Sequence, residues 1–290
     1  MREESLEQPT PAGKLSGTLA LPSGTGPWPV VLLIAGSGPA DRDGNSALMP
    51  EATGHMKRLA HALAEQGLAS LRYDKRGLGG SEHPGLREDD LRFRHLVEDA
   101  VALATRLGQD RRLGPLLLAG HSEGALIAAL AARDVPLSAA VVSIAGAGQK
   151  ASELIRAQLQ GRLPELLEVT ALAALDALAA EQLVGEPPEA LTLLFRPSLQ
   201  PYLVSWFRYD PAEVVADLPQ PVLLVHGSAD QQVPPGHVAI LRAARPDARL
   251  LVVDGMDHLL AIDSDAARGA SAVAAAIAGL AFELQRDAAA

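Results

Sequence analysis

The stretch Pro115–Ala132 (PLLLAGHSEGALIAALAA) decides the fold of this 290-residue chain. It begins with a continuous apolar run, which is typical of a strand buried on both faces of a sheet. The run then passes through GHSEG into an alanine-rich segment that is typical of a helix. A strand that turns sharply into a helix leaves no room for side chains beside the turn. We therefore predict that Gly120 and Gly124 permit a tight turn that presents Ser122 above the sheet edge.

The rest of the chain repeats this alternation of strand and helix. Apolar or alternating runs predict strands at residues 14–21, 30–35, 68–73, 139–145, 221–225 and 249–253, and helical spacing predicts helices at 56–66, 90–107, 123–133, 235–244 and 264–284. Buried strands that alternate with helices indicate an α/β fold with a mostly parallel sheet covered on both faces. Sheets of this kind place their functional residues at the carboxyl ends of the strands.

One long segment interrupts this rhythm. Residues 148–210 show no strand pattern, and Ile155, Leu159 and Leu163 recur at helical spacing. We expect a helical insertion there, within a core domain formed by residues 1–147 and 211–290.

The charge balance narrows the class of partner. The chain has 25 Lys and Arg against 35 Asp and Glu, which gives a formal net charge of −10. This argues against a nucleic-acid binder, which needs a basic face to replace the counterions of phosphate, and against binding to an anionic membrane. The absence of cysteine excludes disulfides and thiolate chemistry.

The first residues of the chain carry little hydrophobic signal. Residues 1–14 are charged and contain prolines, without an apolar run, so we expect a disordered or loosely attached lead rather than a signal peptide. We also find no apolar stretch of about 18 residues, the length that a spanning helix needs. These features predict a soluble, cytoplasmic protein.

Three strand ends supply a candidate catalytic triad. A serine hydroxyl is a weak nucleophile at neutral pH and needs an adjacent base, which a third group orients. Asp230 follows the apolar run at 221–225, and His258 follows the run at 249–253. Ser122, Asp230 and His258 thus form a nucleophile, an acid and a base in the chain order known for one such arrangement.

Other histidines and acids fit these roles less well. We expect His226 to be a packed core histidine and His237 to be a surface residue at a helix start. Asp254 and Asp257 flank His258 in the sequence, and we expect them to cap or solvate its loop.

When a serine attacks a carbonyl carbon, the carbonyl oxygen becomes an oxyanion, which needs two hydrogen-bond donors. We expect one to be the N–H of Glu123, the residue after the nucleophile, and the other to be the N–H of Ser37. Gly36 and Gly38 flank Ser37 and let the backbone approach a substrate.

Charged residues lie near these donors in the sequence. The Glu123 side chain hangs beside the nucleophile, and we expect Arg42 or Arg76 to neutralise it, because an unpaired buried carboxylate is costly. For Asp74 and Arg76 we favour a structural role in a charge-paired turn.

Five segments together resemble the α/β-hydrolase superfamily, in particular bacterial carboxylesterases related to serine aminopeptidase-like hydrolases. They are Ile34–Asn45 (IAGSGPADRDGN), Leu71–Ser81 (LRYDKRGLGGS), GHSEG, HGSADQQVP and GMDH. The resemblance implies a mostly parallel eight-stranded sheet with helices on both faces and a helical cap between strands six and seven, where residues 148–210 lie. Ala35 departs from the pattern, since many relatives have histidine before the oxyanion glycine.

The resemblance and the triad together predict a serine esterase for short to medium acyl chains. Its partner is a small-molecule ester, and we expect no metal and no cofactor. An aminopeptidase or a thioesterase on the same triad stays open, as does a homodimer, and a non-catalytic binding protein is the remaining alternative. At least one of four aromatic residues should line the substrate pocket: Phe195, Trp206, Phe207 or Tyr209.

Overall fold

In the computed structural model, which describes residues 1–46 and 51–287, eight strands pair into one sheet. They are β1 (Arg2–Thr10), β2 (Gly13–Leu21), β3 (Trp28–Ile34), β4 (Ala69–Tyr73), β5 (Leu113–His121), β6 (Ser138–Ile144), β7 (Val222–Gly227) and β8 (Arg249–Val253). Their order in the sheet is β1-β2-β4-β3-β5-β6-β7-β8. β2 pairs antiparallel with both β1 and β4, whereas the pairs from β4 to β8 are parallel. The predicted α/β class and the mostly parallel sheet are confirmed.

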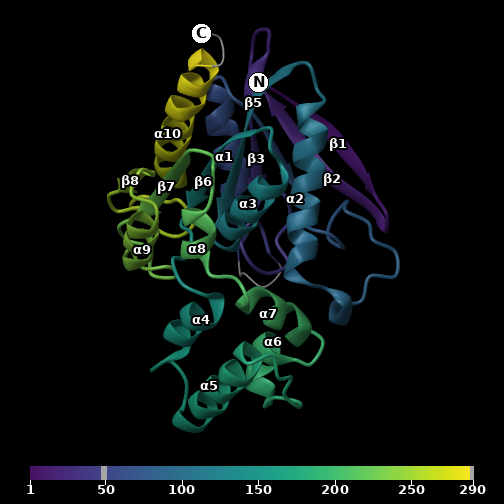
Figure 1. Cartoon of the computed structure of the whole chain (residues 1–290), viewed down its shortest axis with the longest axis vertical. Coiled ribbons are helices and arrows are strands. Elements are labelled where there is room, and N and C mark those ends of the chain that lie inside the picture. The colour runs from purple at the N-terminus through teal and green to yellow at the C-terminus, as the bar shows by residue number, and fades with distance from the viewer. Residues whose placement is uncertain (47–50, 288–290) are drawn as a thin grey trace.

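Helices cover both faces of this sheet (Figure 1). α1 (His55–Glu65) and α10 (Ala266–Asp287) pack together on one face. The other face carries α2 (Phe93–Gly108), α3 (Glu123–Asp134), α8 (Pro211–Ala216) and α9 (Gly236–Ala244), and a 3₁₀ turn, η1 (Glu88–Asp90), precedes α2.

The two cores follow from the alternation of side chains along each strand. In β3, Leu32 belongs to the cluster with α2 and α3, whereas Val31 and Leu33 belong to the cluster with α1 and α10. β3 is therefore apolar along its whole length, as the continuous run in the sequence indicated.

The expectation of a disordered lead was wrong. Residues 2–10 form β1, which pairs with β2 in an unbroken antiparallel register from Arg2 opposite Leu21 to Thr10 opposite Gly13. The strand is an edge strand with charged side chains, so it lacks the apolar run by which a buried strand is detected. Glu3 of β1 also binds Arg72 of β4, with 3.0 Å between the carboxylate and the guanidinium.

The segment between β6 and β7 is helical and lies beyond one end of the sheet (Figure 1). It contains α4 (Ala151–Leu159), α5 (Glu165–Ala179), η2 (Glu189–Leu191), α6 (Thr192–Phe195) and α7 (Gln200–Phe207). Phe93 at the start of α2 joins the two parts, because its ring stacks on Trp206 at 5.8 Å and its N–H donates to Ser205 Oγ. The division of the chain into a core and a cap at residues 148–210 stays a prediction.

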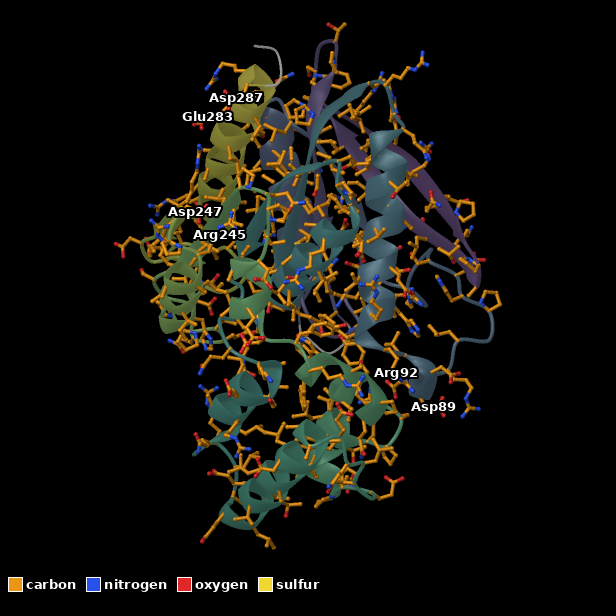
Figure 2. All side chains as sticks on the ribbon, viewed as in Figure 1. Asp89, Arg92, Arg245, Asp247, Glu283 and Asp287 are labelled. Carbon is orange, nitrogen blue, oxygen red and sulfur yellow. The ribbon has the colours of Figure 1, made fainter. Side chains whose placement is uncertain are left out.

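Within residues 1–46 and 51–287, one helix, α10, meets the length and composition of a membrane span. Over its most apolar 18-residue window the mean hydropathy is 1.3, and 44% of that window is buried. Val273 and Ile277 are buried against α1 and the sheet, and Glu283 and Asp287 lie on the outer side (Figure 2). A core helix of a folded domain passes the same test, so the feature is weak evidence for a span.

Candidate active site

The turn between β5 and α3 has the strained geometry that the sequence predicted. Ser122 has φ 55° and ψ −120°, a conformation that costs energy for a residue with a side chain. A Cβ on Gly120 would lie 1.8 Å from the Gly124 carbonyl oxygen, and a Cβ on Gly124 would lie 2.3 Å from that of Ile34. Both glycines are therefore required by close backbone contacts.

Asp230 and His258 come together at the ends of β7 and β8. His258 Nδ1 lies 2.8 Å from Asp230 Oδ2, and both side chains are buried. The other carboxylate oxygen accepts hydrogen bonds from the backbone N–H groups of Gln232 and Val233, each at 2.9 Å. The carboxylate is thus fixed in place before it meets the imidazole.

His258 lies beside the Ser122 turn. His121, the residue before Ser122, has Nε2 2.8 Å from the backbone oxygen of His258, and the two rings are 4.8 Å apart. The structure therefore brings the three predicted triad residues to one place. Among the described residues, Ser122 Oγ has no hydrogen-bond partner, so its hydroxyl is not engaged in a structural bond.

The two predicted oxyanion donors flank the same serine. A Cβ on Gly36 would lie 3.2 Å from Ser122 Cβ, so the backbone after β3 runs directly beside the nucleophile. Glu123 begins α3, where the first N–H groups lack helical partners. Neither the Ser37 nor the Glu123 N–H donates a hydrogen bond to a described residue. Both remain able to bind an anion.

The expected partner of the Glu123 carboxylate was wrong. Lys75, which follows β4, places Nζ 2.9 Å from Glu123 Oε2, and Tyr202 of α7 donates its hydroxyl to Oε1. Arg42 and Arg76 are engaged elsewhere. Since the loop after β4 has three adjacent charged residues, the sequence alone did not show which of them turns inward.

The predicted charge-paired turn is present, although each residue pairs outside the loop. The Asp74 carboxylate accepts two hydrogen bonds from Arg42, one from Nε at 3.1 Å and one from the backbone N–H at 2.8 Å. Burial raises the pKa of Asp74, but these bonds and one from Gly80 outweigh it and hold the pKa below its usual value. Arg76 forms a fork with Asp99 of α2, with distances of 2.7 and 2.8 Å.

Three histidine rings, His55, His121 and His258, lie in a row with their planes tilted against one another. The ring of His55 lies 4.9 Å from that of His121, which lies 4.8 Å from that of His258. Burial and the neighbouring His258 and Arg58 lower the pKa of His55 to about 4. Burial, His258 and His55 also hold the pKa of His121 well below its usual value. His55 and His121 are therefore neutral at pH 7, so the ring next to the candidate base His258 is uncharged.

The histidines and acids that the sequence offered as alternatives to His258 and Asp230 have structural roles. His226 is fully buried, and its Nε2 lies 2.8 Å from the Val233 carbonyl oxygen, which agrees with a packed core histidine. His237 is buried as well, and its Nδ1 accepts a hydrogen bond from the Gly148 N–H at 3.2 Å. The expectation that His237 lies on the surface was therefore wrong. Asp257 caps its own loop, accepting from Leu259 N–H at 2.9 Å.

The four aromatic residues proposed for a pocket mainly join the insertion to the core. Phe195 and Phe207 are buried, and Trp206 and Tyr209 pack on the ring of Phe93. A role in substrate binding stays a prediction for all four. Across residues 1–46 and 51–287, no group of three or more His, Asp or Glu is placed to hold a metal ion.

The sequence patterns did not predict two residues of the site, Lys75 and Tyr202. Lys75 follows the strand β4, so the strand-end rule that located Asp230 and His258 also applied to it. Tyr202 lies within the insertion, where helical spacing gives no indication of which side chain faces the nucleophile.

Comparison with known proteins places this geometry in a family. Residues 49–194, half of the chain, match the family model described as serine aminopeptidase, S33. The match includes Lys75 and Ser122 and ends before Asp230. Esterase EstD of Thermotoga maritima is 27% identical over 249 residues, which cover 85% of this chain and 58% of that protein. The chain thus spans little more than half of the length of this curated relative.

Solved structures show the same fold. Est1E from Butyrivibrio proteoclasticus has a TM-score of 0.65 at 17% identity, covering 97% of this chain and 99% of its own. The esterase domain of a Rhodothermus marinus protein has a TM-score of 0.63 at 22% identity, covering 96% and 99%. With the family match and the observed sheet, these similarities show that the chain belongs to the serine aminopeptidase S33 family of the α/β-hydrolase superfamily.

Proposed function

We propose that this protein is a serine esterase that hydrolyses carboxylic esters of short to medium acyl chain length. The observation that carries the proposal is the bond between Asp230 and His258 beside the strained turn of Ser122. An acid, an imidazole and a presented hydroxyl from three strand ends match the roles of a catalytic triad. The similarity to Esterase EstD supports the choice of ester substrates.

The geometry suggests how each group acts. Ser122 Oγ attacks the ester carbonyl while His258 Nε2 takes its proton, and Asp230 holds the imidazole and stabilises its positive charge. The Ser37 and Glu123 N–H groups stabilise the oxyanion. His258 then protonates the departing alcohol, which leaves an acyl-enzyme. Water, deprotonated by His258, then attacks the acyl carbon, and His258 returns the proton to Ser122 Oγ as the acid is released.

The pairing of the carboxylate beside the nucleophile favours an ester over an aminopeptidase substrate. An aminopeptidase must hold a substrate ammonium, which requires an inward-facing carboxylate. In the insertion, the carboxylates of Glu153, Glu165, Asp176, Glu181, Glu186 and Glu189 are exposed. The half-buried Glu168 accepts the N–H of Gly161, and Glu123 is already paired with Lys75. The carboxylate beside the Ser122 turn, that of Glu123, is therefore already engaged and is not available to an amine.

A substrate panel tests the proposal. Nitrophenyl esters of increasing acyl length should be hydrolysed, with the highest kcat/KM for short to medium chains, and aminoacyl-anilides should be hydrolysed far more slowly. The Ser122→Ala variant serves as the control for background hydrolysis. Faster cleavage of the anilides than of the esters would contradict the esterase proposal and indicate an aminopeptidase. No cleavage of either substrate class would contradict any catalytic function.

A further inference from the structure

Lys75 contacts both sides of the proposed oxyanion hole. Its Nζ lies 2.5 Å from the Gly36 carbonyl oxygen, 2.9 Å from Glu123 Oε2 and 3.5 Å from the Gly38 carbonyl oxygen. The ammonium has three protons, and these three acceptors account for them. The side chain is 9% exposed, so its charge is held inside the protein.

We propose that Lys75 is a positioning residue that aims the Ser37 N–H at the oxyanion, an inference that rests on the esterase function proposed above. The reason lies in the peptide unit between Gly36 and Ser37. In a trans peptide, the carbonyl oxygen and the N–H of one plane point in opposite directions. An ammonium bound to the Gly36 oxygen therefore fixes the direction of the Ser37 N–H on the other side of that plane. Gly36 lies beside Ser122, so that direction matters for the reacting oxygen.

The charge of Lys75 acts in the same sense. A cation bound to a carbonyl oxygen polarises the amide and makes its N–H a stronger donor. Donors that are oriented in advance stabilise the developing oxyanion without reorganisation during the reaction. Neutralisation of Glu123 alone would not require the contacts with two backbone carbonyls in the loop after β3.

Glu123 and Tyr202 complete the network and extend it to the insertion. Glu123 supplies the second proposed oxyanion N–H, and its carboxylate balances the buried ammonium. Tyr202 of α7 donates to the same carboxylate. Burial and the adjacent Glu123 hold the pKa of Tyr202 well above its usual value, so the hydroxyl remains a donor. The insertion is thus connected to Lys75 through Glu123.

Three variants separate positioning from simple charge balance. Lys75→Met removes the ammonium but leaves the Glu123 carboxylate buried without its cation. Lys75→Met with Glu123→Gln removes both charges, so it should recover most of the lost stability while the Gly36 carbonyl still lacks its donor. Arg76→Met is the matched control, because it breaks the neighbouring buried ion pair with Asp99 and contacts neither Gly36 nor Gly38.

The readouts are ester kinetics, urea unfolding and inhibition by a trifluoromethyl ketone. Ser122 Oγ adds to the carbonyl carbon of this ketone, and His258 takes the hydroxyl proton. The carbonyl oxygen becomes an oxyanion, so the adduct mimics the transition state. We expect Lys75→Met and the double variant to lose about 10- to 100-fold in kcat with KM within about 2-fold of wild type. The inhibition constant of the ketone should rise by a similar factor.

The controls make the result decisive. Arg76→Met should lose stability to a degree similar to Lys75→Met and retain kcat within about 3-fold. Recovery of wild-type kcat in the stable double variant would show that Lys75 only neutralises Glu123, and unchanged kcat in folded Lys75→Met would also overturn the inference. If Lys75→Met does not fold, the double variant alone decides. Absence of both hydrolysis and ketone inhibition in the wild type would instead refute the esterase function and this inference with it.

Discussion

At the residue scale, the carboxylate of Asp230 shows how backbone and side chain cooperate in the site. One oxygen accepts two backbone N–H groups of its own loop, and the other is left for His258 Nδ1. This division fixes which nitrogen of the imidazole carries the proton. The Nε2 atom is then free to act as a base toward Ser122.

The Asp230→Asn substitution tests that division of roles. The amide oxygen can keep the two backbone bonds, but the amide nitrogen cannot accept a proton from Nδ1, so the imidazole adopts the wrong tautomer. We expect kcat to fall by about 10³- to 10⁴-fold with little change in the fold, measured by ester kinetics and circular dichroism. Asp254→Asn is the matched control, since this exposed carboxylate binds Ser228, and it should retain activity. Equal losses in the two variants would contradict the role of Asp230.

The buried His55 predicts a pH dependence of stability. Its pKa is about 4 in the folded protein against 6.5 as its ordinary value, so the folded state disfavours the protonated form. The contribution to stability is complete above pH 6.5 and is lost as the pH falls from 6.5 toward 4. Between pH 7 and pH 5 the wild-type free energy of unfolding should fall by about 2 kcal/mol more than that of His55→Gln. The comparison uses urea unfolding at both pH values.

A second histidine variant controls for general acid effects. His61 is half-exposed and binds Glu3, so His61→Gln should keep the pH dependence that His55→Gln loses. An identical pH dependence in wild type and His55→Gln would show that His55 does not stay neutral at low pH in the fold.

At the element scale, the sequence predicted every strand of the sheet except the edge strand β1. Apolar runs in the sequence predict the central strands, because both faces of these strands are buried. β1 is held by backbone pairing with β2 and by ion pairs such as Glu3 with Arg72, neither of which leaves a hydrophobic pattern. The ends of predicted strands located Asp230 and His258. The partner of Glu123 depended on a contact of Lys75 with a residue 48 positions away, which no local pattern shows.

The turn between β5 and α3 makes the clearest prediction for an element. In Gly124→Ala the new methyl group would lie 2.3 Å from the Ile34 oxygen and 2.7 Å from that of Ala35, so the strand or the helix must move. We expect a loss of about 3 kcal/mol in the free energy of unfolding, together with loss of activity. The measurement is urea unfolding.

The matched control for this turn lies within α10. A Cβ at Gly279 has no atom within 4 Å, so Gly279→Ala adds helix propensity without a clash. It should gain about 0.5 to 1 kcal/mol. A loss at Gly279 similar to that at Gly124 would mean that crowding at the turn does not explain the requirement for glycine.

At the scale of the whole molecule, the insertion reaches the Ser122 turn, and we expect it to restrict the approach of large substrates. Phe93 and Trp206 join it to the core, and Tyr202 reaches the nucleophile turn. Four large apolar residues of the insertion are exposed, and they are divided between α5, the segment after it and α6: Leu166, Val169, Leu183 and Leu193. A net charge of −10 also disfavours polyanionic substrates. These features favour small, uncharged esters in solution over emulsified lipid.

Interfacial kinetics check this expectation. The rate of hydrolysis of a short-chain triglyceride should rise smoothly with concentration and level off, without a jump where the substrate passes its solubility limit. A sharp rise at that limit would reveal a lipase-like surface on the insertion.

The central claim, that Ser122 is the nucleophile of a Ser122–His258–Asp230 triad, is tested most directly by labelling with a fluorophosphonate probe. The reaction forms a bond between Ser122 Oγ and phosphorus, fluoride leaves, and His258 takes the hydroxyl proton. We predict one probe per chain, located on Ser122 by peptide mass spectrometry, with loss of labelling in Ser122→Ala and His258→Ala. Labelling should persist in Ser228→Ala, which removes an exposed serine bound to Asp254. Undiminished labelling of Ser122→Ala, or a label on another serine of the wild type, would contradict the account.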